Sequence, residues 1–273
     1  MQPQPVNEGP TLSSLIALDS AELADRMLEP ATMQAIYEDT ESIIAKNRTP
    51  GGLEALVQNA IETMEGLWGD LAADSPAYAC KKGCSWCCHQ SVMVTAAEVL
   101  HAAKFLHDNL TDSEVLRLRD LVAARAKQSE GMDNDQRMDQ RVACAFLIDN
   151  ICTIYPVRPL QCRGGFSEDA EYCHNLLDHR EETQAAVSKG EIEGKYLLVP
   201  KMLYDSAQVG MAGALGKNGL NSEPLDLTTA MAIALGDKNI VEKWLRGWPV
   251  FERARLHRLQ GGTADKYVTR APQ

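Results

Sequence analysis

The stretch Cys80-Lys81-Lys82-Gly83-Cys84-Ser85-Trp86-Cys87-Cys88-His89 holds half of the eight cysteines in this 273-residue chain. The others are Cys144, Cys152, Cys162 and Cys173, so every cysteine lies within residues 80–173. Thiols gathered in this way are typical ligands of a soft metal ion or an iron–sulfur cluster. A disulfide framework is the alternative, but the cysteine content is far below that of disulfide-rich scaffolds.

The spacing within the first group indicates which thiols can share a site. Cys84 and Cys87 have the two-residue spacing that lets two thiolates bind one metal centre. Gly83 precedes them, where a positive φ would turn the backbone towards the metal. Cys80, four positions before Cys84, can reach the same site. Cys88 directly follows Cys87, and adjacent side chains point apart in an extended chain. Cys88 therefore contributes to a second centre or remains a free or supporting thiol.

The second group has dispersed cysteines. They are separated by eight, ten and eleven positions, so none forms a CxxC pair. Ligands this far apart need a folded scaffold in order to converge. Pro156 and Pro159 would stiffen the connecting loop and so reduce the entropy lost when the site closes.

Cations accompany the thiols. Lys82 lies in the first group, and Arg158 and Arg163 lie in the second. Positive charges would lower the pKa values of the thiols and stabilise an anionic centre, so we take these three as cofactor-binding candidates. Surface ion pairs are the alternative for the two arginines.

Three runs of residues carry a family resemblance. They are Cys80-x3-Cys84-x2-Cys87-Cys88, then Cys144-Ala145-Phe146-Leu147, then Cys152-Thr153-Ile154-Tyr155-x2-Arg158-Pro159-x2-Cys162-Arg163. Together they resemble the CxxCxxCC family of zinc- or iron-chelating proteins, also called the YkgJ-type cysteine-cluster family. The chain departs from the family in the first spacing and at Ala145, where the family often has proline. The first departure leaves Cys80 the weakest ligand candidate.

The resemblance implies a zinc or iron site and leaves the reaction open. A flagellin lysine methylase is similar in its cysteine pattern and looks like an iron–sulfur enzyme linked to S-adenosylmethionine, which suggests methylase-like chemistry by analogy. The chain has no glycine-rich nucleotide loop after a strand. We therefore identify no catalytic residue from the sequence.

Charge and composition limit the partners. The formal net charge is −11 and the pI is about 5.1, so nucleic acid and anionic membrane surfaces are poor partners. The first residues do not resemble a secretory signal, and no run approaches the ~18 apolar residues of a membrane span. We expect a cytoplasmic protein whose partners are a metal ion or cluster and an unidentified protein or small molecule.

The apolar pattern predicts a mainly α fold, with cysteine-bearing loops held between helices. Apolar residues over 53–67 recur at i, i+3 and i+4. Capping boxes at Thr95 and Thr111 predict two further helices. Other expected elements are a helix from residue 20 that Pro30 interrupts, a break at 49–52, a short strand at 91–94, a flexible segment at 130–140, a loop with short turns at 143–173, and helices near 174–187, 196–215, 227–235 and 240–245.

We divide the chain into five parts. They are a disordered N-terminal segment (1–19), an N-terminal helical region (20–76), a cysteine-cluster metal-binding domain (77–180), a C-terminal helical region packed on it (181–265) and a tail (266–273).

The predicted function is metal binding through clustered thiolates that hold zinc, iron or an iron–sulfur cluster such as [4Fe–4S]. The alternative is an iron–sulfur-dependent redox or group-transfer enzyme. The best ligand candidates are Cys84, Cys87, Cys88, Cys144, Cys152 and Cys162, with Cys80 and Cys173 as ligands of the same or a second centre. His89 and His174, each next to a cysteine, are further candidates, with exposed imidazoles as the alternative.

Overall fold

The computed structural model describes residues 28–258 and 267–269 of the chain. The predicted disordered segment 1–19 lies outside the described residues, as do residues 20–27. Within the described part the fold is mainly α, as predicted, and each strand has two residues. No helix in this part is long and apolar enough to cross a membrane.

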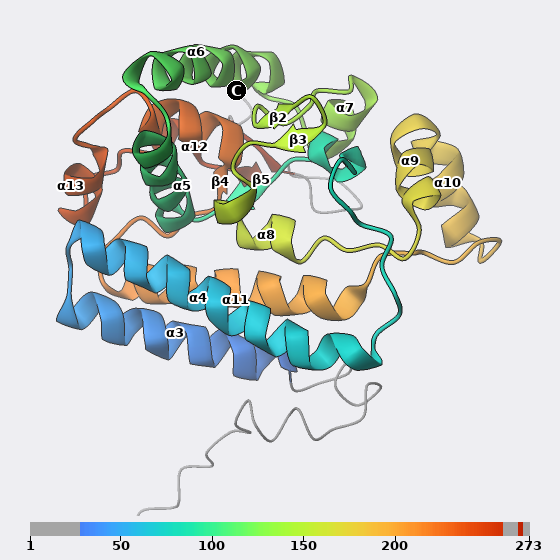
Figure 1. The fold of residues 1–273 in the computed structure, drawn as a ribbon, viewed down its shortest axis with the longest axis horizontal. Helices are drawn as coiled ribbons and strands as arrows, with labels where there is room; N and C mark the ends of the chain where they lie inside the picture. Colours follow the sequence, from blue (N-terminus) through green and yellow to red (C-terminus); the bar gives the residue numbers. More distant parts are fainter. Residues whose placement is uncertain (1–27, 259–266, 270–273) are drawn as a thin grey trace, which may run out of the picture.

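Three long helices lie side by side along one edge of the molecule and form what we call the helical layer (Figure 1). They are α3 (Leu28–Lys46), α4 (Pro50–Leu71) and α11 (Leu198–Lys217). Gly210 of α11 comes so close to the Met33 carbonyl of α3 that a Cβ at this position would clash with it. Glycine permits this approach, and it allows α3 and α11 to bury Ile36 and Leu203 completely.

The break predicted at residues 49–52 is the start of α4. Thr49 Oγ1 accepts a hydrogen bond from the Gly52 amide at 3.2 Å, and Pro50 occupies the first turn, where its missing N–H costs no helical bond. Pro30 lies in the first turn of α3 in the same way, so the predicted interruption is wrong. The predicted apolar face of α4 is confirmed by its buried residues, which include Leu53, Leu56, Val57, Ala60, Ile61, Met64 and Leu67.

A second group of helices lies on the other side of the molecule (Figure 1). It contains α5 (Ala96–Asn109), α6 (Asp112–Ser129), α12 (Leu227–Ala234) and α13 (Ile240–Leu245). Both predicted capping boxes are present, since the Thr95 and Thr111 hydroxyls accept from the N3 amides and the N3 glutamates accept from the cap amides. Helix α12 packs against α5 and α6.

The segment predicted to be flexible contains a helix, α7 (Asn134–Asp139). Asp133 caps it by accepting from the Gln136 amide at 2.9 Å, and the Gln136 side chain accepts from the Asp133 amide at 3.0 Å. Arg180 pairs with both Asp135 and Asp139. The prediction was wrong because α7 is polar and is held by distant ion pairs rather than by an apolar face.

Short elements connect the two groups of helices. Pairing is antiparallel between β1 (Met93–Val94) and β4 (Leu225–Asp226), β2 (Leu147–Ile148) and β3 (Ile151–Cys152), and β5 (His257–Arg258) and β6 (Tyr267–Val268). The remaining short helices are η1 (Ala72–Asp74), η2 (Trp86–His89), η3 (Tyr155–Val157), α8 (Leu160–Arg163), α9 (Ala170–Asp178), α10 (Arg180–Ser188) and η4 (Glu252–Ala254). The strand at 91–94 is therefore confirmed, while β6 gives order to two residues of the predicted tail.

Candidate metal centre

The first cysteine group is a turn followed by a short helix. The Cys84 amide donates to the Lys81 carbonyl at 2.9 Å, and Gly83 between them has a φ of 89°, as the sequence predicted. Cys87 and Cys88 lie in η2. Because η2 is helical rather than extended, the expectation that these neighbours point far apart rests on the wrong backbone geometry, and the two thiols interact with each other.

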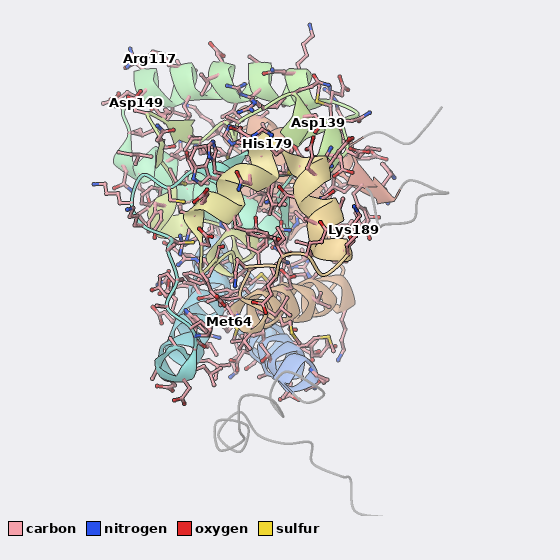
Figure 2. The ribbon with its side chains drawn as sticks, turned by 90° about the vertical axis from the view of Figure 1, so that its right-hand side faces the viewer. Met64, Arg117, Asp139, Asp149, His179 and Lys189 are labelled. Atoms are coloured by element: carbon pink, nitrogen blue, oxygen red, sulfur yellow. The ribbon has the colours of Figure 1, made fainter. Side chains whose placement is uncertain are left out.

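The second group is joined directly to the first. The Cys144 amide donates to the Cys88 carbonyl at 2.7 Å. Cys152 lies in β3, directly across from Leu147 in β2. The turn between these strands is built on Asp149 and Asn150, whose φ values are 50° and 60°, so Asp149 acts as a turn residue at the surface (Figure 2).

Cys162 is placed by α8, which a buried carboxylate holds at its start. Glu98 Oε1 accepts from the Leu160 amide at 2.9 Å, and Glu98 Oε2 accepts from the Thr95 amide at 2.7 Å. The Gln208 side chain of α11 also donates to this carboxylate at 3.0 Å. Burial raises the pKa of Glu98, while these hydrogen bonds oppose the rise. Glu98 thus connects α5, α8 and α11.

The two cysteines not yet described, Cys80 and Cys173, lie near residues 165–167. The Ala79 amide donates to the Ser167 carbonyl at 2.8 Å, which places the Cys80 sulfur 4.0 Å from the carbonyl oxygens of Gly165 and Ser167. Cys173 is buried on α9 and interacts electrostatically with Cys80.

Five of the other seven thiols interact with Cys87. Cys80, Cys88, Cys152, Cys162 and Cys173 all interact electrostatically with it. A hydrogen bond with the Cys88 thiol lowers the pKa of Cys87 to about 7, whereas the same bond and burial raise the pKa of Cys88. Burial raises the pKa of Cys144 to about 11 and that of Cys162 well above its ordinary value. The Cys87 thiol therefore loses its proton more readily than the Cys88, Cys144 and Cys162 thiols.

The donor set fits a soft metal. All eight cysteines are free thiols, and three separate parts of the chain bring them together. In the described residues, no three His, Cys, Asp or Glu side chains are placed to hold one metal ion as they stand. Binding a metal would therefore require thiol side chains to turn towards one another.

The arginines have different environments. Arg158 lies 4.3 Å above the exposed Tyr155 ring, and its charge acts on Cys80, Cys87, Cys152 and Cys162. The Nε of Arg158 is buried and has no hydrogen-bond partner among the described residues.

Arg163 is buried and bonded to the backbone. It donates to the carbonyl oxygens of Pro156 and Arg158 at 2.5 and 2.9 Å, and it pairs with Glu65 of α4. Arg163 therefore braces the loop that carries Arg158. Lys82 is exposed in the turn before Cys84.

The histidines next to the cysteines have protein partners. His174 packs its ring on Trp86 at 4.3 Å and pairs with Asp178 at 2.8 Å. His89 Nδ1 lies 3.3 Å from the Trp86 carbonyl oxygen, and burial lowers the pKa of His89. Trp86 thus packs against α9 beside Cys173.

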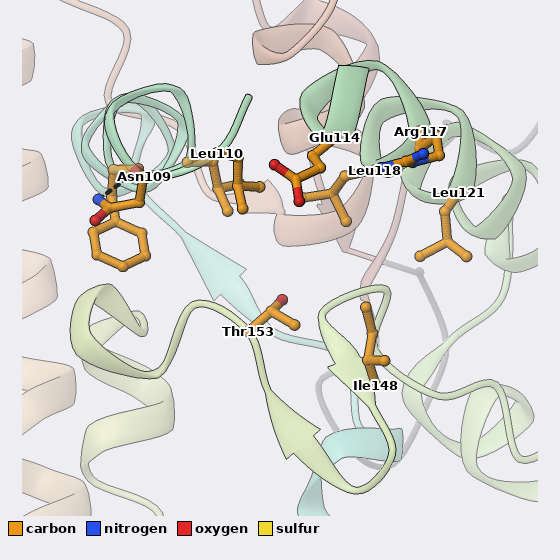
Figure 3. A pocket seen from close by; sticks show the side chains of 10 residues that line it. Asn109, Leu110, Glu114, Arg117, Leu118, Leu121, Ile148 and Thr153 are labelled. Atoms are coloured by element: carbon orange, nitrogen blue, oxygen red, sulfur yellow. Dashed lines mark hydrogen bonds between the residues drawn. The ribbon is translucent and has the colours of Figure 1, made fainter. Parts of the chain in front are cut away.

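The β2–β3 hairpin has two different faces. Cys152 and its partner Leu147 lie on one face, and Ile148 and Thr153 lie on the other, because side chains alternate along a strand. The second face closes a pocket of about 440 Å³ against α5 and α6 (Figure 3). Its other lining residues are Phe105, Leu106, Asn109, Leu110, Glu114, Arg117, Leu118 and Leu121.

Sequence analysis missed Glu98 as a supporting residue of the site, along with Gln90 and Tyr196. The sequence showed Thr95 and Glu98 as a capping box, which explains the hydrogen bonds between these two residues. It does not explain the hydrogen bonds of Glu98 with Leu160 and Gln208. Tyr196 contacts the Gln90 side chain 106 positions away, and no local pattern predicts this contact.

Residues 79–183 match the model of a protein family, CxxCxxCC, which is described as "Putative zinc- or iron-chelating domain". No curated protein and no solved structure matched the chain. The family description supports metal binding by these residues, which contain all eight cysteines. Residues 79–183, less than half of the chain, are thus similar to the CxxCxxCC domain family.

Proposed function

We propose that this chain is a metal-binding protein that holds zinc, iron or an iron–sulfur cluster through cysteine thiolates. The observation that carries the proposal is the gathering of free thiols from three parts of the chain around Cys87. Unpaired thiols suit a reducing compartment such as the cytoplasm. The proposed ligands are Cys84, Cys87, Cys88, Cys144, Cys152 and Cys162, with Cys80 and Cys173 completing the same or a second centre.

Charge compensation supports this assignment. Four thiolates on zinc or on a [4Fe–4S] core leave an anionic centre. The charge of Arg158 acts on four of the proposed ligands: it adds to the lowering of the Cys87 pKa and opposes the rise that burial causes in the pKa values of Cys80, Cys152 and Cys162. Arg163 would contribute mainly by holding the backbone carbonyl of Arg158. Lys82, which is exposed, would contribute only long-range attraction.

A second candidate function is an iron–sulfur-dependent redox or group-transfer enzyme. The observation that favours it is that residue Cys87, with which five other thiols interact, lies at the surface of the protein. An iron–sulfur cluster would supply electron transfer at such a site. Zinc would supply a structural cross-link between the cysteine segments.

The first test is elemental analysis with an absorption spectrum on protein purified without oxygen. Iron and sulfide in stoichiometric amounts, with broad visible absorption, would identify a cluster and favour the enzyme. A colourless protein with stoichiometric zinc would favour a binding or structural role. A folded protein that takes up neither metal, even after reconstitution, would refute the proposal.

Ligand variants test the assignment. Cys84→Ser and Cys152→Ser should each lose metal and stability together, because binding to a structural site is part of the folding free energy. Thr153→Ser is the matched control for the second variant, since Thr153 lies on the opposite face of the hairpin and should retain all metal. Full retention in both cysteine variants would overturn the ligand assignment.

A further pair of variants tests the number of centres. If one mononuclear ion is bound, Cys88→Ser should lose less metal than Cys87→Ser. Equal losses would indicate a cluster or two centres. Metal content per folded protein, measured after desalting without oxygen, separates these outcomes.

A further inference from the structure

Helix α7 contacts the chain on both sides of the hydrogen bond that joins the two cysteine groups. That bond runs from the Cys144 amide to the Cys88 carbonyl. On the first side, the Ser91 amide, three residues after Cys88, donates to Asn134 Oδ1 in the first turn of α7 at 2.9 Å. The end of the first cysteine group is therefore anchored to α7.

The second side is held by Arg137 of α7, which is 3% exposed. Its Nε donates to the Val142 carbonyl at 3.3 Å, and its own carbonyl accepts from the Val142 amide at 2.9 Å. Val142 is completely buried and lies two residues before Cys144. Two hydrogen bonds thus fix the start of the second cysteine group to the same helix.

The charge of Arg137 is balanced inside the protein. One of its terminal nitrogens lies 3.5 Å from Asp226 Oδ2, and the other donates to Thr228 Oγ1 at 3.4 Å. Both partners are buried, and both lie beyond residue 183, where the family match ends. A buried charge is costly unless it is paired and hydrogen-bonded, so these partners keep the guanidinium in the position from which it holds Val142. Burial raises the pKa of Cys144, and the charge of Arg137 opposes this rise.

We propose that Asn134 and Arg137 are positioning residues of the metal centre, which hold Cys88 and Cys144 beside one another by anchoring their segments to α7. This inference rests on the proposed function, because it assigns both cysteines as ligands. Since the thiols have still to turn towards a metal, the separation of their backbones limits which of them can meet at one ion. Removing groups that orient metal ligands typically weakens metal affinity by about 10- to 100-fold.

The test is titration of the metal-free full chain with Co²⁺, whose bonds to thiolate give a charge-transfer absorption. The wild type is compared with Arg137→Met and Asn134→Ala, which each remove one anchor. Arg137→Met should bind Co²⁺ about tenfold more weakly, and both variants should shift the charge-transfer band. Asn134→Ala should have the smaller effect, because its bond to Ser91 is exposed. If the elemental analysis described above identifies a cluster, cluster content and visible absorption after reconstitution replace the Co²⁺ readout.

Each variant has a matched control. Thr228→Val removes another buried hydrogen bond of Arg137 and leaves the bonds to Val142 in place. Gln136→Ala breaks the capping box of α7 and leaves the bond between Asn134 and Ser91 in place. Both controls should lower the thermal stability of the metal-free protein, while the Co²⁺ affinity and the band stay as in the wild type.

The outcomes separate this inference from the proposed function. Wild-type affinity and band position in Asn134→Ala, or in folded Arg137→Met, would overturn the inference and leave metal binding intact. Equal losses in a variant and its control would also overturn it, because general stability would then explain the effect. If Arg137→Met does not fold because Asp226 is left unpaired, the comparison of Asn134→Ala with Gln136→Ala decides. If wild-type protein bound neither Co²⁺ nor the metals tested above, the proposed function and this inference would both fail.

Discussion

The helical layer and the cysteine region use different means to hold their shape. In the layer, Met64 and Leu203 are completely buried by apolar neighbours, and each such side chain contributes about 1.5–3 kcal/mol through burial. In the cysteine region most elements are only two to four residues long, and the buried side chains of Glu98 and Arg163 hydrogen-bond to the backbone of the segments around α8. In Figure 2, Met64 of the layer lies low in the view, and His179, between α9 and α10, lies above it.

The difference indicates that stability and metal binding are separable in part. Apolar burial needs no ligand, whereas short elements whose thiols must turn to meet a metal depend on that metal for their final arrangement. Variants in the layer should therefore change unfolding with and without metal alike. Variants in the cysteine region should change mainly the gain in stability that metal provides.

The largest effect is expected in the layer. Leu203→Ala removes a fully buried side chain of α11 and should cost about 3 kcal/mol of unfolding free energy. Denaturant unfolding with and without chelator should give the same loss. Val209→Ala, at an exposed position of the same helix, is the control and should change little. Loss of metal by the folded Leu203→Ala protein would mean that the layer and the site form one unit.

The next effect is expected where the two regions meet. Glu98→Gln keeps the shape of the side chain but replaces one carboxylate oxygen, which accepts hydrogen bonds, by an NH₂ group, which donates them. The amides and the Gln208 side chain that donate to Glu98 would then lose an acceptor. We expect a loss of about 2 kcal/mol, because hydrogen bonds to charged groups contribute ~1.5–3 kcal/mol. We also expect weaker metal retention, since α8 carries Cys162.

Glu114→Gln is the matched control, because Glu114 has the same position in the second capping box, at the exposed start of α6. It should cost much less stability and no metal. Equal effects in the two variants would show that the link from Glu98 to α8 does not matter for the site.

A smaller effect depends on pH. His101 is 7% exposed and both ring nitrogens lack partners among the described residues. Burial lowers the pKa of His101, the charges of Arg163 and Lys104 lower it further, and Glu54 opposes them. His101 is therefore protonated more readily in the unfolded chain than in the folded protein. The free energy of unfolding should fall as the pH drops below about 6.5, where the unfolded chain takes up this proton.

His101→Leu should reduce this slope in unfolding measurements between pH 5 and 8, the range where histidine titrates. His107→Leu, at an exposed position of the same helix, should keep the wild-type slope. An unchanged slope in His101→Leu would place the pH dependence elsewhere.

The smallest effect is expected for a surface pair on the layer. Asp205→Asn removes the charge that pairs with Lys201 one turn earlier on α11, where both side chains are largely exposed. Such pairs contribute ~0.3 kcal/mol in helices, and salt screens them. A loss above 1 kcal/mol in thermal unfolding would show that charges matter in the layer as they do in the cysteine region.

Local patterns explain which parts of the fold were predictable. The capping boxes at Thr95 and Thr111 and the apolar face of α4 involve contacts within one or two turns, so their signals lie in consecutive residues. Helix α7 has no such apolar face, and its ion pairs with Arg180 come from a distant part of the chain. Propensity and periodicity therefore gave no sign of it.

The candidate site divides in the same way. The turn at Gly83 was predicted from the residue type and is confirmed, and the cysteine ligands stay a prediction from spacing and residue type. The contacts of Glu98 with Gln208 and of Tyr196 with Gln90 join distant parts of the sequence, so only the folded chain creates them. Arg158 and Arg163 were indistinguishable in sequence. The fold separates them, because the charge of Arg158 acts on four of the thiols, whereas Arg163 is bonded to backbone carbonyls and to Glu65.

The contact between α3 and α11 bears on the order in which the protein is made. The whole cysteine region lies between these helices in the chain, and synthesis proceeds from the N-terminus. When Cys173 is translated, α11 has still to be made, so α3 and α4 lack their contacts with α11. A nascent chain thus offers every thiol to metal or oxidant before its longest-range packing can form, and such distant contacts are slow to assemble. All eight proposed ligands are thus translated before the helix that completes the layer.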